Sequence, residues 1–319
     1  MRWLLCAALA LGAAFPAAAQ QGTLRIVLGF PAGATADLLS RLVAEHMRAS
    51  LGQPVIVENR PGAGGRIANE AVKAAAPDGA TLLLTPVATM AIYPHSMPGE
   101  LRYDPLRDFA PVAHLASFQL GFGVSAALPA RTLAEYVALV KRDPKAGFYA
   151  SAAAGSLPHF LGVMFARSAG IELTHVPYKG TAPAMQALAA GEIAAISTVV
   201  ADIGTLVQAG KARLLATAGD KRSAAFPDVP TFRESGYDLE ASGWYALFAP
   251  AGTPAAAVER VSAAAIAAVR DPALRSRLEQ IGLEPTGLGP RELAAIVKAD
   301  YERWGPVIRA SGFKPGAGR

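Results

Sequence analysis

The chain has 319 residues, of which 52% are hydrophobic, and its formal net charge is +5. This length can bury substantial cores and suits two domains better than one. The basic residues are scattered and interleaved with acidic ones, as in "KRDPK", which argues against a nucleic-acid surface, although local donors could still bind one small anion.

The N-terminus has the pattern of a cleavable secretory signal. Arg2 precedes an apolar run from Leu4 to Phe15, and three small residues, 17–19, end the segment. The run is shorter than the roughly 20 apolar residues of a membrane-spanning helix. We therefore predict a signal peptide over residues 1–19 and a soluble, exported mature chain. Cys6, the only cysteine, lies in that signal, so the mature chain has no disulfide or cysteine-bound metal.

Strands and helices alternate along the next part of the chain. The pattern predicts strands over residues 24–30, 54–60 and 81–86, and helices over residues 36–50 and 67–75. A glycine-rich turn, residues 61–66, precedes the second helix. It lacks the GK[ST] ending of a phosphate loop and the third glycine of a dinucleotide fingerprint, so a tight turn is the better interpretation. Such alternation is typical of an open, mostly parallel sheet.

A second series of the same kind begins near Leu120. A capping box from Thr132 to Glu135 starts one helix, and Gly170 and Gly191 end two others. The predicted strands are residues 120–126, 147–152, 172–178, 193–200 and 212–219, and the predicted helices are residues 135–143, 158–170 and 181–191.

In the last part of the chain, the sequence pattern predicts one strand, over residues 244–254, followed by three helices. The helices start at Thr253-Pro254, Asp271-Pro272 and Gly289-Pro290, and the third reaches about Ser311. Three consecutive helices do not build another sheet, so we expect them to cover the first one. This makes the first domain discontinuous: residues 20–122 and 244–319 form domain 1, and residues 123–243 form domain 2. Two crossings, near residues 112–122 and 240–248, then form a hinge, and a ligand is expected in the cleft between the lobes.

Two strand-to-helix turns are the candidate binding loops. In "GFPAGATAD", Gly33 permits close approach of a ligand, and Thr35 and Asp37 can cap the following helix while leaving N–H groups for an anion. In "SAAAGSLPHF", Gly155 and Ser156 repeat this arrangement in the second lobe. An ordinary capped turn explains either loop alone, whereas two such loops facing one cleft favour a binding site. Three to five backbone and hydroxyl donors could hold a carboxylate at about micromolar affinity.

Catalysis and metal binding are less well supported by the sequence. Ser156 and His159 suggest a hydrolase, but there is no GxSxG motif and no third member of a triad, and His159 could instead cap a helix or line the cleft. The histidines lie outside metal-ligand spacing. We therefore predict no enzymatic activity, no metal site and no cofactor.

Several phrases, taken together in their order and spacing, resemble the Bug family, the periplasmic substrate-binding proteins of tripartite tricarboxylate transporters. The resemblance covers essentially the whole mature chain, and the phrases are "GFPAGATADLLSRLVAEHM", "LGQPVIVENRPGAGG", "APDGATLLLTP", "YDPLRDFAPVA", "AGSLPHFLGVMF", "HVPYKGTAPAMQAL", "AGKARLLATAGDKRSAAFPDVPTFRESGY" and "LFAPAGTP". It implies an α/β periplasmic binding protein of type 2, the Venus-flytrap fold, with two open, mostly parallel sheets. It also implies a location in the periplasm, a small organic carboxylate as ligand and the permease subunits of a tripartite transporter as partner.

The resemblance also implies which residues contact the ligand. In that family the loop after the first strand holds a ligand carboxylate, partly through ordered waters, and the matching loop of the other lobe completes the site. Carried over by motif, the first loop gives Phe30, Gly33, Thr35 and Asp37, the second gives Ser151, Gly155, Ser156 and His159, and further cleft positions are Thr85, Thr89 and Thr198.

Two positions depart from the family pattern. Ala34 stands where a second glycine is common, and Ala194 stands where many members have an aspartate. The first could narrow the carboxylate pocket, and the second removes a charge that could meet an amino or hydroxyl group. We therefore expect an apolar or aromatic carboxylate in preference to an amino acid. A periplasmic sensor that acts on a receptor kinase uses the same clamp and stays an alternative, and a monomer is expected because the clamp must open and close.

Overall fold

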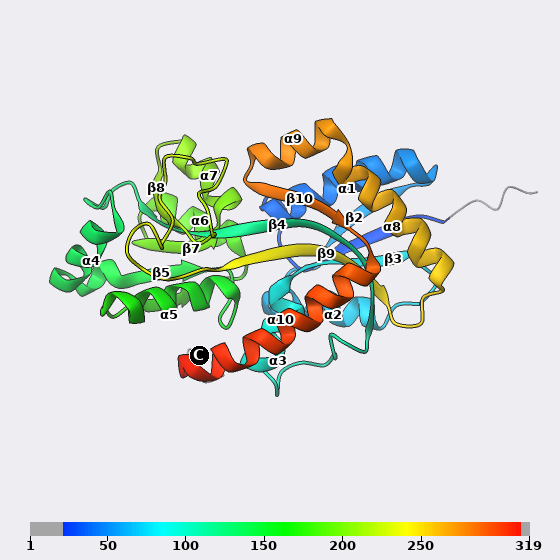
Figure 1. Ribbon diagram of the computed structural model, residues 1–319, viewed down its shortest axis with the longest axis horizontal. Coiled ribbons are helices and arrows are strands. Elements are labelled where there is room, and N and C mark those ends of the chain that lie inside the picture. The colour runs from blue at the N-terminus through cyan, green and yellow to red at the C-terminus, as the bar shows by residue number, and fades with distance from the viewer. Residues whose placement is uncertain (1–21, 314–319) are drawn as a thin grey trace, which may run out of the picture.

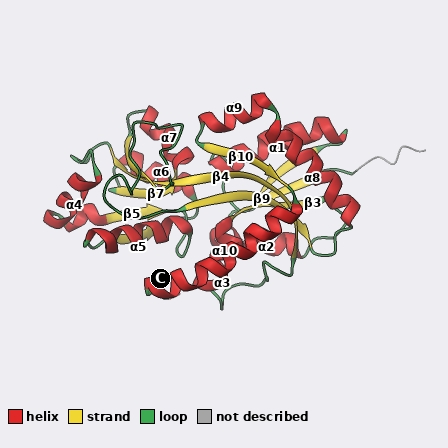
Figure 2. Cartoon of the chain, in the orientation of Figure 1, coloured by secondary structure: helices red, strands yellow, loops and turns green. Residues whose placement is uncertain are grey.

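The computed structural model describes residues 22–313, so the predicted signal peptide, residues 1–19, lies outside the described part (Figure 1). Strands run through the middle of the molecule, and helices cover them on both sides (Figure 2). In chain order the elements are β1 (Leu24–Leu28), α1 (Thr35–Leu51), β2 (Val55–Asn59), η1 (Ala63–Gly65), α2 (Arg66–Lys73), β3 (Thr81–Pro86), η2 (Ala88–Ile92), α3 (Tyr93–Ser96), β4 (Phe109–Ser125), α4 (Leu133–Arg142), η3 (Pro144–Gly147), β5 (Phe148–Ser151), α5 (Leu157–Ala169), β6 (Thr174–Pro177), α6 (Thr181–Ala190), β7 (Ala195–Val199), α7 (Val200–Gln208), β8 (Ala212–Thr217), β9 (Ser242–Pro250), α8 (Ala255–Arg270), α9 (Pro272–Gln280), β10 (Leu283–Leu288) and α10 (Pro290–Ser311).

The first part of the sheet forms as the sequence predicts. β1 pairs in parallel with β2 and β3, and α1 and α2 lie between these strands in the chain. α1 turns Leu39, Val43 and Met47 toward the core, at helical spacing, and all three are fully buried. The glycine-rich residues 61–66 contain η1 and lead directly into α2, as expected of a tight turn.

Two strands, β4 and β9, connect the two halves of the molecule. The first part of β4 pairs with β9 and β10 and its second part pairs with β7 and β8, all antiparallel. Within residues 22–313 the strands therefore form one ten-stranded sheet, in the order β2-β1-β3-β9-β4-β7-β5-β6, with β8 and β10 also paired to β4.

Each half has one of the two predicted open sheets, but both sheets include β4, which joins them, and β4 and β9 add antiparallel pairs to the parallel ones. β4 and β9 run in opposite directions between the halves, and their pairing satisfies the backbone groups of both crossings. The residue boundaries 122/123 and 243/244 between the two domains stay a prediction.

The second half has the predicted parallel strands and one helix that the sequence analysis missed. β5 pairs in parallel with β6 and β7. Thr132 caps α4 by accepting a hydrogen bond from the backbone N–H of Glu135, and Gly170, with φ of 61°, ends α5 as predicted. α7 begins at Val200, directly after β7. The apolar run "ISTVV" hid this boundary, because periodicity does not separate a buried strand from the start of a buried helix.

The C-terminal helices cover the first half of the sheet, as predicted. α8 packs against α1 and β4, and α10 packs against β4 and η2. The strand β10, which lies between α9 and α10, was missed. The end of α10 reaches the second half, where Arg167 Nη1 donates to the carbonyl oxygen of Ala310 at 3.1 Å (Figure 1). Within residues 22–313, no helix has both the length and the apolar character needed to cross a bilayer.

Candidate functional site

A small cavity lies between the two halves, where the predicted loops meet. Its volume of about 60 Å³ offers room for a few water molecules. The start of α1, the segment after β3, the start of α5 and the end of β7 contribute to its wall. The lining residues are Phe30, Ala34, Ala36, Pro86, Val87, Ala88, Tyr93, Phe118, Ala152, Ala153, Ser156, Leu157, Pro158, Thr181, Thr198, Val199, Asp202 and Tyr245. Of the predicted site residues, Phe30, Ser156 and Thr198 line this cavity, while Gly33 and Thr35 line the adjoining groove between α1, α6 and α7.

The first predicted loop places the N-terminal end of α1 at the cavity. Gly33 has a φ of 93°, which glycine adopts without the steric penalty of a Cβ atom. Thr35 is the first residue of α1, and its backbone N and its Oγ1 lie 2.8 and 2.5 Å from Oδ1 of Asp202 on α7. Because the first N–H groups of a helix lack partners within it, this end of α1 can hold a carboxylate.

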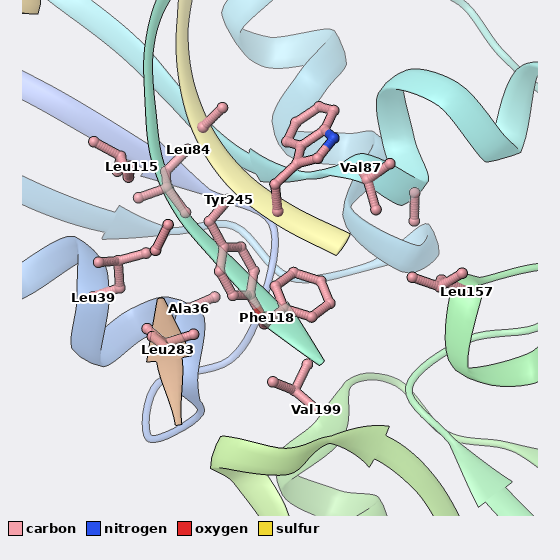
Figure 3. Close-up of a cluster of buried hydrophobic side chains, with 14 of the residues drawn as sticks. Ala36, Leu39, Leu84, Val87, Leu115, Phe118, Leu157, Val199, Tyr245 and Leu283 are labelled. Carbon is pink, nitrogen blue, oxygen red and sulfur yellow. The ribbon is translucent and has the colours of Figure 1, made fainter. Parts of the chain in front are cut away.

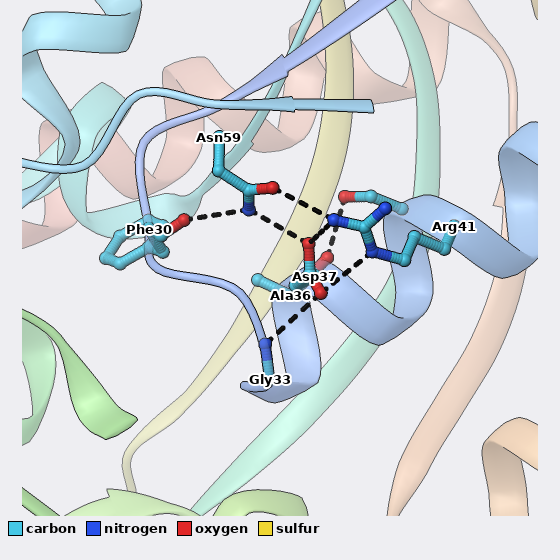
Figure 4. A network of polar contacts seen from close by, with 7 residues as sticks. Phe30, Gly33, Ala36, Asp37, Arg41 and Asn59 are labelled. Atoms are coloured by element: carbon cyan, nitrogen blue, oxygen red, sulfur yellow. Dashed lines mark hydrogen bonds and ion pairs between the residues drawn. The ribbon is translucent and has the colours of Figure 1, made fainter. Parts of the chain in front are cut away.

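Asp37 lies behind this loop and does not line the cavity (Figure 4). Its carboxylate accepts hydrogen bonds from Arg41 Nε and Nη2 at 3.0 and 2.9 Å, from Asn59 Nδ2 at 2.9 Å and from Gly33 N at 3.2 Å. Burial acts to raise the pKa of Asp37, but these hydrogen bonds outweigh it and the net pKa is lowered. In the structure Asp37 fixes Gly33 and the start of α1 through these bonds, and its contact with a ligand stays a prediction.

The second predicted loop is held by the first turn of α5. Ser156 is the N-cap of this helix, and its Oγ donates to the carbonyl oxygen of Ala153 at 2.7 Å and accepts from the backbone N–H of His159 at 3.4 Å. Gly155 donates its N–H to Nδ1 of His159 at 2.8 Å. His159 thus fixes the loop from behind, while Ser156 faces the cavity.

Ser151 and His159 belong to a buried cluster with His175. Ser151 Oγ lies 2.6 Å from His175 Nε2, and the two imidazole rings stack with centroids 4.0 Å apart. Burial lowers the pKa of His159 to about 4, and burial together with His159 lowers the pKa of His175 to about 3. Both rings are therefore neutral at pH 7 and stay so well into the acidic range. The cluster supports the loop from outside the cavity wall.

The predicted cleft residues Thr85 and Thr89 lie behind the wall formed by residues 86–88. Their Oγ1 atoms are 2.6 Å apart, and Thr85 Oγ1 also donates to Asn69 Oδ1 at 3.3 Å. Thr89 Oγ1 lies 3.1 Å from the carbonyl oxygen of Pro86. These hydroxyls bond to the protein itself and shape the segment that the cavity touches.

Among residues 22–313, Asp202 is the one charged residue that lines the cavity, and the sequence analysis missed it because it lies on the missed helix α7. Its Oδ2 accepts a hydrogen bond from Thr198 Oγ1 at 3.3 Å, and the side chain of Thr181 also bonds to it. Burial raises the pKa of Asp202, although the hydrogen bonds from Thr35, Thr198 and Thr181 act in the opposite direction. An acidic residue in the first turn after a buried run is the signal that could have found it.

Aromatic rings form the inner wall of the cavity. Phe118 on β4 and Tyr245 on β9 pack with ring centroids 4.7 Å apart, and Figure 3 shows them between Ala36 of α1 and Val199 of the other half. Burial raises the pKa of Tyr245 well above its usual value, so its hydroxyl stays protonated. The wall can therefore pack against an apolar or aromatic group and adds no charge.

The two departures from the family pattern have different outcomes. Ala34 lines the cavity, where its methyl group can narrow the pocket as expected. Ala194 lies just before β7, in a surface hollow with Leu128 and Phe148, whereas the cavity is at the other end of that strand, at Thr198 and Val199. The argument that built ligand preference on Ala194 is therefore wrong in its geometry.

The geometry also bears on catalysis and metals. His159 meets Ser156 through its backbone N–H, and its Nδ1 is taken by Gly155, so its imidazole is not in place to activate Ser156. Among residues 22–313, no group of three or more His, Cys, Asp or Glu side chains is arranged to hold a metal ion.

Two α/β lobes, joined by strands that pass between them and enclosing a cavity at helix N-termini, define a two-lobed periplasmic binding protein. A sequence profile described as the tripartite tricarboxylate transporter family receptor matches residues 39–313. The chain belongs to this family of solute-binding receptors, which includes the Bug proteins.

Solved structures of the same family are closely similar to this chain. The periplasmic binding protein BugD has 30% identical residues and a TM-score of 0.85, and the match covers 92% of this chain and 99% of BugD. MatC from Rhodopseudomonas palustris with bound malate has 32% identity and a TM-score of 0.85, covering 90% and 99% of the two chains. Rpa4515 from R. palustris with adipate has 30% identity and a TM-score of 0.89, covering 92% and 98%.

Proposed function

We propose that this protein is a periplasmic solute receptor that binds a small organic carboxylate between its lobes and delivers it to the membrane subunits of a tripartite transporter. The observation that carries the proposal is the cavity itself, because the N-terminal ends of α1 and α5 both reach it from opposite lobes. The bound malate and adipate of two similar receptors support the ligand class.

The proposed binding groups donate hydrogen bonds and perform no chemistry. Thr35 offers its backbone N–H and hydroxyl at the start of α1, and the Ser156 and Thr198 hydroxyls line the cavity from the other lobe. Each hydroxyl has one proton, so to donate to a solute Ser156 must turn from the carbonyl oxygen of Ala153, and Thr198 from Oδ2 of Asp202. A hydrogen bond to a charged group contributes about 1.5–3 kcal/mol, so three to five such bonds reach the roughly 8 kcal/mol of micromolar affinity. The aromatic wall of Phe118 and Tyr245 would pack against the rest of the solute.

Thermal denaturation of residues 20–319 against mono-, di- and tricarboxylates and their amides tests this function. At a concentration one hundredfold above its dissociation constant, a true ligand stabilises the protein by about 2.7 kcal/mol, or a few degrees in Tm. We expect a shift with an acid and none with its amide. The absence of a shift with every acid, in protein shown by mass spectrometry to carry no bound solute, would refute the carboxylate class.

Ser156→Ala tests one of the proposed ligand contacts. If Ser156 donates to the bound carboxylate, its loss weakens binding by about 1–3 kcal/mol. Ser235→Ala is the control, because the Ser235 hydroxyl donates to the carbonyl oxygen of Thr231 outside the cavity. Equal affinity in both variants would remove Ser156 from the set of ligand contacts.

A further inference from the structure

The carboxylate of Asp202 forms hydrogen bonds with the opposite lobe. Asp202 belongs to α7 in the second lobe, yet its Oδ1 takes both the backbone N–H and the hydroxyl of Thr35 in the first lobe, at 2.8 and 2.5 Å. These are the donors that the proposed function assigns to a solute carboxylate. The protein's own side chain thus occupies the anion position at the start of α1.

Asp202 is held in the way that an anionic ligand would be held. Thr35 contributes two donors, and Thr198 and Thr181 contribute one hydroxyl each. All of these donors are neutral groups, and together they match the roughly four acceptor positions of a carboxylate. None of the ion pairs found among residues 22–313 includes Asp202. With its acceptor positions filled, this carboxylate does not require an ammonium group of the solute as partner.

We propose that Asp202 is an internal ligand of the cleft: it holds the lobes together when no solute is bound, and a solute carboxylate must displace it from Thr35. The displacement of Asp202 by a solute rests on the proposed function, whereas its contact between the lobes does not. Without a solute, the receptor is held closed by the same donors that the proposed function assigns to the solute carboxylate.

The same arrangement makes Asp202 a specificity-determining residue. Asp202 is the only carboxylate among the residues that line the cavity, and no lysine, arginine or histidine lines it. After displacement from Thr35, its carboxyl group stays near Thr198 and Thr181, because it is fixed on α7. A second carboxylate on the solute would then meet this group and no cation, which is unfavourable at every pH at which Asp202 is ionised. The inference is that the receptor prefers apolar monocarboxylates to di- and tricarboxylates.

Small-angle X-ray scattering of solute-free protein tests the internal ligand. The protein is unfolded, dialysed and refolded first, so that no solute from expression remains. We expect a larger radius of gyration for Asp202→Ala than for wild type, because the bonds across the cleft are lost. Thr205→Ala, one turn further along α7, is the control and should remain as compact as wild type, since its hydroxyl donates to the backbone carbonyl oxygen of Asp202 within the same helix. If Asp202→Ala does not fold, Thr35→Val removes one donor from the opposite lobe and should also expand the molecule. Equal radii for wild type and the folded variant would overturn the internal ligand.

Hexanoate and adipate test the specificity, because they share a six-carbon chain and differ by one carboxylate. By calorimetry, wild type should bind hexanoate more tightly than adipate. Asp202→Asn should bind adipate at least about tenfold more tightly than wild type does, because the competing charge is gone. Tighter binding of adipate than hexanoate by wild type, or weaker binding of adipate by Asp202→Asn, would overturn the specificity. If neither acid nor any other carboxylate binds any form, the proposed function fails, and the scattering comparison still decides whether Asp202 closes the cleft.

Discussion

A methyl group added at Gly155 should act as a wedge between the lobes. Gly155 has a φ of 69°, and a Cβ atom there would lie 2.5 Å from Met97 Cε and 3.1 Å from Ser96 Oγ of the opposite lobe. Gly170→Ala is a matched control at the other end of α5, because its φ is 61° and a Cβ there would meet no atom within 4 Å. Both variants carry the backbone strain of roughly 1–2 kcal/mol, and only Gly155→Ala adds the contact across the cleft.

The contact between the added Cβ atom and Met97 forms only when the lobes are closed. It should therefore destabilise the closed arrangement and leave the open one unchanged. Because the end of the Met97 side chain can move, we take the lower end of the overpacking range, about 1 kcal/mol. Such a penalty lowers the ratio of closed to open protein by roughly fivefold, and it lowers the apparent affinity for a solute by at most that factor, because the solute-bound form is closed. Calorimetric titration with the acid that gives the largest thermal shift measures the affinity, and scattering of the solute-free protein measures the expansion. If Gly155→Ala and Gly170→Ala have the same affinity and the same radius of gyration, the reasoning is refuted.

Two other predictions concern stability. Asp37→Asn should lower the free energy of unfolding by about 1–3 kcal/mol, because the bonds from Arg41 and Gly33 lose their charge assistance. Chemical denaturation checks this against the exposed control Asp228→Asn, and equal stability of the two variants would contradict it. The neutral pair His159 and His175 should make the protein sensitive to acid. Since their pKa values fall from 6.5 in the unfolded chain to about 4 and about 3, the unfolded state binds more protons below pH 6.5. Their contribution to stability is complete above that pH and is lost as the pH falls through about 4 for His159 and about 3 for His175. The Tm of wild type should fall over this range, and the Tm of His159→Gln should fall less steeply. Parallel plots of Tm against pH for the two proteins would contradict this prediction.

Local patterns in the sequence predict most of the elements and the two candidate binding loops. Periodic apolar residues such as Leu39, Val43 and Met47 specify a helix packed on a sheet, and local chemistry specifies its ends, as the cap at Thr132 and the αL residue Gly170 show. These features depend on neighbours within a few residues, so they can be inferred without the fold. For the same reason both strand-to-helix turns could be recognised as candidate binding loops.

Errors arose where a residue's role depends on distant partners. The apolar run ending in Val200 is compatible with either a strand or a helix, so the start of α7 and the orientation of Asp202 were missed. Asp37 has the sequence pattern of a cap that faces a ligand, but Asn59, which lies 22 positions away in the chain, turns its carboxylate away from the cavity. Ala194 lies just before β7, at the end of that strand remote from the cavity.

How the two lobes meet depends on contacts between residues that are far apart in the chain. The hydrogen bond from Thr35 to Asp202 joins residues 167 positions apart, and no local pattern of either segment contains it. The continuity of the sheet through β4 is likewise a property of pairing, because a strand's sequence gives its buried faces and not its partners. Local physical chemistry therefore determined the donors at the start of α1, whereas the packing of the lobes determined that a carboxylate of the protein itself is bound there.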